Sequence, residues 1–218
     1  MFAEFVWCIV DASAGGSRLR NAEDRMNREE FIASIRDHQP ELLAETYLAA
    51  NSVTAFPNAD DYASFKARVQ RRVTGAESVS IVGTGNWRFS LNPEKSLKEF
   101  DGRSDIDIAV VSPNDFNQTW EELRRIHRSR WYTFSPEIRD RLRRNGEDVY
   151  SGFINPTWIP GRVSKVRYRF KAMLNQLSDE SVNFKPIKML FFKNELEAID
   201  YYKRGFLLIK RRVERDEI

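Results

Sequence analysis

The chain has 218 residues, a net charge of +3 and a single cysteine, Cys8, so a disulfide within it and a cysteine-based zinc cluster are both excluded. Because the only histidines are His38 and His127, any metal must be held by oxygen ligands, which suits Mg²⁺ or Mn²⁺. No apolar run approaches the ~20 residues that a transmembrane helix needs, so we expect a cytoplasmic protein with no membrane partner.

The first part of the chain is predicted to be helical after an extension. Residues 1–25 include a flexible Gly-Gly-Ser segment, and we expect them to be a poorly ordered extension or an upstream start that is not used in the cell. From residue 29 onward apolar side chains recur at helical spacing, with a break at Pro40. A second helix is expected over 60–73 and ends at Gly75.

Two strands separated by a glycine turn are expected next. The β-branched run 79–82 predicts a buried strand that stops at Gly83-Thr84-Gly85. Residues 86–103 show no clear period and are interpreted as an insertion or an extended helix. Residues 105–111 predict the second strand, which is apolar except for two aspartates, and a helix opens directly after it.

The rest of the chain alternates helix and strand. We expect a basic helix over 136–144 that leads to Gly146, an irregular segment over 149–160, a helix over 163–177, a strand within 182–192 shortened or bulged at Pro186, and a last helix over 195–212. The predicted fold class is therefore α+β (α/β), with a short mixed sheet flanked by helices and with helical amino-terminal and carboxy-terminal parts.

Asp105 and Asp107 are the first candidates for a functional site. Side chains two residues apart on a strand project to the same face, so the two carboxylates stand side by side while Ile106 enters the core. Like charges on an apolar strand repel and are costly to desolvate, and a divalent cation between them removes that cost. The alternative is that the aspartates form ion pairs with Arg88 or Arg103.

The glycine turn supplies a second set of candidates. The backbone N–H groups of Gly83-Thr84-Gly85 can cradle phosphate oxygens, and Thr84 adds a hydroxyl donor. Asn86, Arg88 and Ser90 lie just past the turn and are candidates for phosphate contacts, with a surface arginine as the alternative interpretation of Arg88. A strand, a glycine turn and a later strand bearing Asp-x-Asp form a more specific pattern than either element alone.

Val82-Gly83-Thr84-Gly85 followed by Ser104-Asp105-Ile106-Asp107-Ile108 resembles the hydrophobic-Gly-Ser and Asp-x-Asp signature of DNA polymerase β-like nucleotidyltransferases, with Thr84 in place of the usual serine. The motif covers residues 79–111. The resemblance implies a nucleotidyltransferase-like domain over 26–192, with 193–218 as a helix packed on it. It also implies that Gly83 and Thr84 hold the β- and γ-phosphates of a nucleoside triphosphate, and that Asp105 and Asp107 ligate one or two Mg²⁺ ions and are the catalytic residues. Gly85, Asn86, Arg88 and Ser104 are the further residues expected to bind the nucleotide.

One departure from the family bears directly on activity. The family places a third carboxylate on a later strand, where it acts as metal ligand and general base. The strand expected within 182–192 contains no acid. Glu147 and Asp148 can substitute if their segment folds back onto the sheet. Alternatively, Lys185 or Lys188 neutralises the aspartates and leaves a degenerate, metal-free site.

These observations support two main functional hypotheses. The first is a Mg²⁺-dependent nucleotidyltransferase that transfers a nucleotidyl group from a nucleoside triphosphate to a protein hydroxyl, an RNA end or another nucleotide. The second is a catalytically degenerate module of the same fold that binds a nucleotide, a nucleic acid or a partner protein, in a bacterial defence or toxin–antitoxin system. A structural α/β domain is the remaining alternative. The arginines within 124–144 favour an anionic acceptor or else form solvated helix faces.

Overall fold

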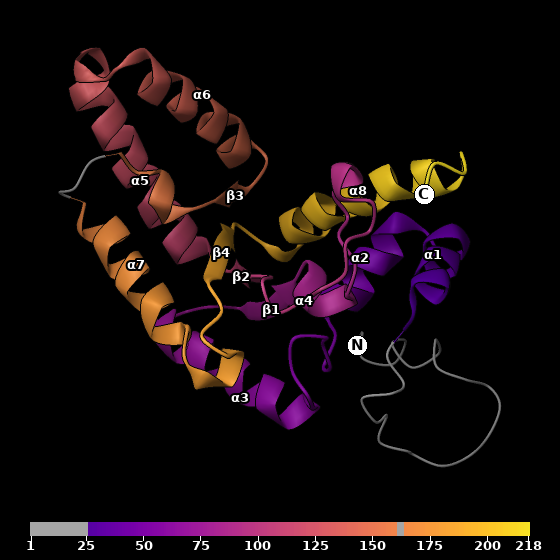
Figure 1. Cartoon of the computed structure of the whole chain (residues 1–218). Helices are drawn as coiled ribbons and strands as arrows, with labels where there is room; N and C mark the ends of the chain where they lie inside the picture. Colours follow the sequence, from indigo (N-terminus) through magenta and orange to yellow (C-terminus); the bar gives the residue numbers. More distant parts are fainter. Residues whose placement is uncertain (1–25, 161–163) are drawn as a thin grey trace, which may run out of the picture.

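The structure, a computed structural model, describes residues 26–160 and 164–218, so the expectation for residues 1–25 lies outside the described residues. The elements in chain order are α1 (Arg28–Asp37), α2 (Pro40–Leu48), α3 (Ala59–Arg72), β1 (Ser78–Val82), α4 (Thr84–Trp87), β2 (Ile106–Val111), α5 (Pro113–Arg130), α6 (Pro136–Tyr150), β3 (Phe153–Ile154), α7 (Lys165–Leu177), β4 (Ile187–Phe192) and α8 (Glu195–Val213), with 3-10 turns at Pro93–Lys95, Trp131–Thr133, Pro156–Trp158 and Glu180–Val182. The predicted α+β fold with helical ends is confirmed (Figure 1).

The sheet has four strands in the order β1-β2-β4-β3. β2 runs antiparallel to β1 and parallel to β4, and β3 runs antiparallel to β4, so the sheet is mixed as predicted. The register pairs Val82 with Asp107, and Asp107 with Lys188. The end of β1 and the beginnings of β2 and β4 therefore meet at one edge of the sheet, and this edge carries the candidate site.

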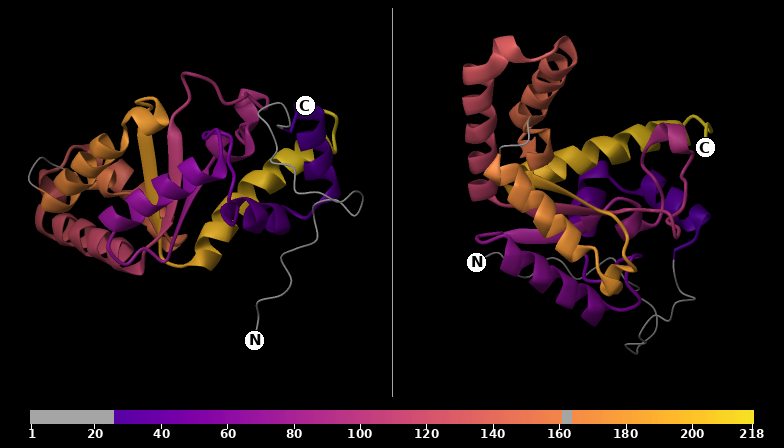
Figure 2. Two further views of the ribbon diagram at one scale, coloured as in Figure 1. Left: turned by 90° about the horizontal axis from the view of Figure 1, so that it is seen from below. Right: turned by 60° about the vertical axis from the view of Figure 1, so that its left-hand side comes forward.

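Alternating side chains on the strands build a separate core on each face of the sheet. Ile81, Ile108 and Met189 belong to the core shared with α3, α5 and α7. Ala109 and Phe192 belong to the core shared with α1, α2 and α8. Figure 2 shows these two sets of helices on opposite sides of the strands. Because helices cover both faces, the strand ends are where the polar side chains of β2 and β4 are open to a ligand.

The helices α5 and α6 form an antiparallel pair that extends away from the sheet (Figures 1 and 2). The prediction that the basic helix stops before Gly146 was wrong, since α6 continues through this glycine to Tyr150. The prediction of an irregular segment over 149–160 missed β3, whose Phe153 and Ile154 pair with β4. Two residues are too few to show a strand period.

The third strand lies within 182–192 and is shortened at Pro186, as predicted, since β4 begins at Ile187. Asn183 and Phe184, just before it, adopt left-handed φ values of 51° and 53° that a strand cannot contain. Of the two alternatives for residues 86–103, the structure shows the insertion, since α4 ends at Trp87 and the next residue, Arg88, has a φ of 75° that no helix continues. Among the described residues, no helix is long and apolar enough to cross a membrane.

Candidate functional site

Gly83 and Asp107 lie against each other at the edge of the sheet. Gly83 connects β1 to α4 with φ 66° and ψ −155°, a conformation open essentially to glycine alone. The antiparallel register brings Asp107 alongside the end of β1. A Cβ added to Gly83 would lie 3.0 Å from Asp107 Oδ2, so the missing side chain is what lets the carboxylate reach the turn. The predicted turn and the predicted carboxylate therefore lie next to each other.

Asp107 is only partly exposed, and its surroundings disfavour its charge. Burial raises the pKa of Asp107 to about 6, and the charge of Asp105 contributes to the same rise. Lys188 and Lys95 oppose the rise but do not cancel it. Near neutral pH the ionised carboxylate is therefore held at a cost, which a bound cation would offset.

This cost predicts a pH dependence of folding for the metal-free protein. The pKa of Asp107 is about 6 in the folded state against an ordinary value of 3.8, so the folded state binds the extra proton between these values and stability falls as pH rises through them. The two values imply a loss of about 2–3 kcal/mol, complete above the folded pKa. Urea denaturation in EDTA from pH 4 to 8 measures the loss. Asp107→Asn should remove this loss. If the stability of the variant fell with pH as much as that of the wild type, Asp107 would not be the group responsible.

Asp105 is paired with a lysine. It lies directly before β2, and its Oδ2 accepts from Lys188 Nζ on β4. Burial acts to raise the pKa of Asp105, but the hydrogen bond and charge of Lys188 outweigh it and hold the pKa below its ordinary value. The hydrogen bond to Asp105 likewise raises the pKa of Lys188. The side chain of Lys188 is 67% exposed, so it can leave Asp105 without disturbing the core.

The other residues named from the sequence make contacts within the protein, and those of Asn86 and Gly85 hold the turn in place. The buried amide of Asn86 donates to the carbonyls of Tyr47 and Ile81, at 2.7 and 2.8 Å. Arg88 donates to Glu99 Oε1 at 2.6 Å and to the carbonyl of Met26. The Gly85 carbonyl accepts from the N–H of Ala55, and a Cβ at Gly85 would lie 3.2 Å from Ile81 Cγ2. Ser104 Oγ donates to Asp101 Oδ1, and Thr84 opens α4 directly after Gly83.

No third carboxylate joins the pair within residues 26–160 and 164–218, where no group of three acidic, histidine or cysteine side chains could hold a metal. Glu147 and Asp148 lie in the last turns of α6. Of the two candidate lysines, Lys188 reaches an aspartate side chain, whereas Lys185 Nζ donates to the backbone carbonyls of Asp101 and Ser104.

Two tyrosines of α8, Tyr201 and Tyr202, lie close enough to Asp107 to respond to its charge. The pKa of Tyr201 is raised by burial, then by Asp148 and Asp107. The pKa of Tyr202 is raised by burial, then by Tyr201 and Asp107. Both tyrosines have the helical spacing of ordinary core residues. Their nearness to Asp107 depends on how α8 packs against the sheet, which no local sequence pattern shows.

The donor set fits a hard divalent cation such as Mg²⁺. Asp105, directly before β2, and Asp107, on β2, offer carboxylate oxygens, and Mg²⁺ is commonly bound by one or two carboxylates together with substrate phosphates. The ammonium of Lys188 competes with a metal ion for Asp105, because an ion bound there must displace the lysine. Asp107 has no such partner among the described residues, which makes it the ligand available without rearrangement.

Comparisons of the chain with family models, with curated proteins and with solved structures found no match.

Proposed function

We propose that the chain is a Mg²⁺-dependent nucleotidyltransferase of the DNA polymerase β-like type that uses a nucleoside triphosphate as donor. The observation that carries the proposal is the close approach of Asp107 to Gly83, which sets a carboxylate at a strand end beside a glycine turn. Glycine turns with free N–H groups suit phosphate oxygens, and carboxylates suit the cation that accompanies a triphosphate.

Each residue of the site has a distinct part in this reaction. Asp105 and Asp107 would hold the ion, while the backbone at Gly83 and Thr84 positions the terminal phosphates. A bound Mg²⁺ supplies charge neutralisation at the triphosphate and at the attacking oxygen. The acceptor hydroxyl oxygen forms a bond to the α-phosphorus, the bond from this phosphorus to the bridging oxygen breaks, and pyrophosphate leaves.

The proton of the acceptor hydroxyl passes to water in this scheme, because the described residues offer no third acid beside the pair. A positioned general base typically contributes about 10²–10⁴-fold to rate, so we expect slow turnover. The acceptor is a hydroxyl of a protein, an RNA end or another nucleotide.

A second candidate function is favoured by the ion pair between Lys188 and Asp105. If the lysine ammonium permanently replaces the metal charge, the site binds a triphosphate without Mg²⁺ and without transfer. The domain would then be a nucleotide-binding module with a degenerate catalytic site. The exposure of Lys188 ranks this candidate second, because an exposed lysine can give way to an ion.

Lys188→Ala separates the two candidates. If the ammonium competes with Mg²⁺ for Asp105, the variant should keep transfer activity and need several-fold less Mg²⁺ for half-maximal rate. If the ammonium replaces Mg²⁺, the variant should lose about tenfold or more in metal-free triphosphate affinity, because one charge-assisted contact is removed. Calorimetric titration of ATP with and without Mg²⁺ measures both. Lys193→Ala, at the exposed far end of β4, is the charge-matched control.

A further inference from the structure

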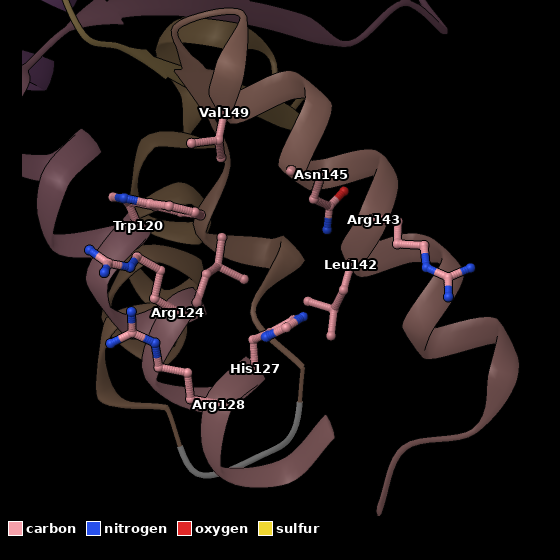
Figure 3. A pocket seen from close by; sticks show the side chains of 10 residues that line it. Trp120, Arg124, His127, Arg128, Leu142, Arg143, Asn145 and Val149 are labelled. Atoms are coloured by element: carbon pink, nitrogen blue, oxygen red, sulfur yellow. The ribbon is translucent and has the colours of Figure 1, made fainter. Parts of the chain in front are cut away.

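A pocket of about 260 Å³ lies between α5 and α6, apart from the carboxylate pair. Its walls are largely apolar and include Leu123, Leu142 and Val149, together with Trp120 on α5. Figure 3 shows Leu142 and Asn145 of α6 facing His127 of α5 across the pocket. Its lining residues lie within α5 and α6, and none comes from the glycine turn or the strands, so it is a second place where a ligand can bind.

A buried amide without a partner points into this pocket. Asn145 is 6% exposed, and its Nδ2 atom has no hydrogen-bond partner among the described residues. A buried donor left unpaired is costly, and such groups are rare in folded proteins. A ligand with a hydrogen-bond acceptor on an otherwise apolar, ring-sized body would satisfy the amide and remove the cost.

Three arginines give the rim of the pocket a positive charge. Arg143 is paired with Asp140 on the same helix, whereas Arg124 lies with its guanidinium 5.5 Å from the ring centre of Trp120. Neither Arg124 nor Arg128 makes an ion pair within the described part of the chain. Their long side chains extend along the outside of α5 in Figure 3 and can fold toward an anion at the pocket mouth.

Gly146 adds an independent observation at the edge of the pocket. Glycine inside a helix is unfavourable relative to alanine, and a conformational or packing reason normally accounts for it. Here α6 is regular through Gly146, and a Cβ at this position would meet nothing within 4 Å. Packing therefore does not require the glycine, and its effect is to keep this edge of the pocket free of a side chain.

We propose that this pocket binds a nucleotide, with the base between α5 and α6 and the phosphate at Arg124 and Arg128. A nucleobase is a flat ring with acceptor atoms on its edge, which matches the Trp120 wall and the Asn145 amide. The volume lies just below the ~300 Å³ at which pockets for whole small ligands begin, so it admits the ring and leaves the phosphate outside. The nucleotide is either free or at the end of an oligonucleotide.

Calorimetric titration of the full chain with AMP, GMP, CMP and UMP tests the proposal. At least one monophosphate should bind, and its nucleoside should bind about tenfold or more weakly, because the charge-assisted contacts are lost. A 5′-phosphorylated trinucleotide, compared with the free monophosphate, distinguishes an oligonucleotide end from a free nucleotide. Equal binding of inorganic phosphate would overturn the proposal in favour of a simple anion site, and the absence of binding by every monophosphate would overturn it outright.

Three variants locate the binding. Arg128→Ala should weaken it about tenfold or more, whereas Arg144→Ala, an exposed arginine of α6 outside the pocket lining, should not change it. Asn145→Leu should fold as the wild type does, since an unpaired buried amide is replaced by an apolar group, and should lose about tenfold in affinity. Equal losses in Arg128→Ala and Arg144→Ala would contradict the pocket assignment. Asp107→Asn should leave this binding unchanged, so the proposal can stand or fall separately from nucleotidyl transfer.

Discussion

Replacing Asp107 by asparagine should abolish nucleotidyl transfer and leave the fold intact. Asparagine keeps the size of the side chain beside Gly83 but removes the negative charge that attracts a cation. Loss of a group that stabilises transition-state charge typically lowers the rate by about 10²–10³-fold, and a direct metal ligand should reach at least that. The assay follows acid-precipitable label from each nucleoside triphosphate, labelled at the α-phosphorus, with a bacterial extract as source of acceptors.

Stability measurements must accompany this assay. Asp107→Asn should unfold at the same or a higher denaturant concentration than the wild type at pH 7–8, because the unfavourable charge is gone. Asp37→Asn, an exposed aspartate at the end of α1, is the matched control and should transfer at the wild-type rate. Full transfer by Asp107→Asn would reject its role as ligand.

Gly83→Ala should produce the second large effect, because it acts on stability and on transfer together. The φ of 66° and ψ of −155° are strained for any residue with a Cβ, and the added atom would stand 3.0 Å from Asp107 Oδ2. Strained backbone of this kind costs about 1–3 kcal/mol. The carboxylate must also move off the turn, so we expect transfer to fall by about 10²-fold, as for a misplaced catalytic group.

Two other glycines separate the causes of this effect. Gly75 has φ 84°, and an added Cβ would have nothing within 4 Å. Gly75→Ala therefore measures the effect of backbone strain without a clash between the new Cβ and a neighbouring side chain. Gly102 has neither feature, and Gly102→Ala should be close to neutral. Thermal unfolding and the transfer assay on all three variants distinguish strain from displacement. A transfer rate in Gly83→Ala equal to that in Gly75→Ala would show that the contact with Asp107 has no role.

The sequence predicted the elements that have strong local signals. The β-branched run before Gly83 and the apolar run around Asp107 have the composition of buried strands, and both strands lie where they were expected. Pro40 proved to be the first residue of α2, where its missing N–H carries no penalty. Elements that depend on long-range contacts were harder to predict. For example, the two residues of β3 form a strand only because β4 lies beside them.

The two aspartates of the candidate site could be predicted from the sequence, but the residues that contact them and the glycine turn could not. That Asp105 and Asp107 lie on the same side follows from the alternation of side chains along an extended chain, although β2 itself begins only at Ile106. That Lys188 and not Lys185 reaches Asp105 depends on the register between β2 and β4, which no local pattern encodes. The engagement of Arg88 with Glu99 depends on how the insertion folds back, and the sequence offered no signal for that path.

The most direct test of the account is a crystal structure of the chain with Mg²⁺ and a non-hydrolysable nucleoside triphosphate. We expect an ion on the carboxylates of Asp105 and Asp107, the ammonium of Lys188 moved away from Asp105, and phosphate oxygens on the backbone N–H groups beside Gly83. A triphosphate bound elsewhere, or a site in which Lys188 still holds Asp105 and no ion is present, would contradict it.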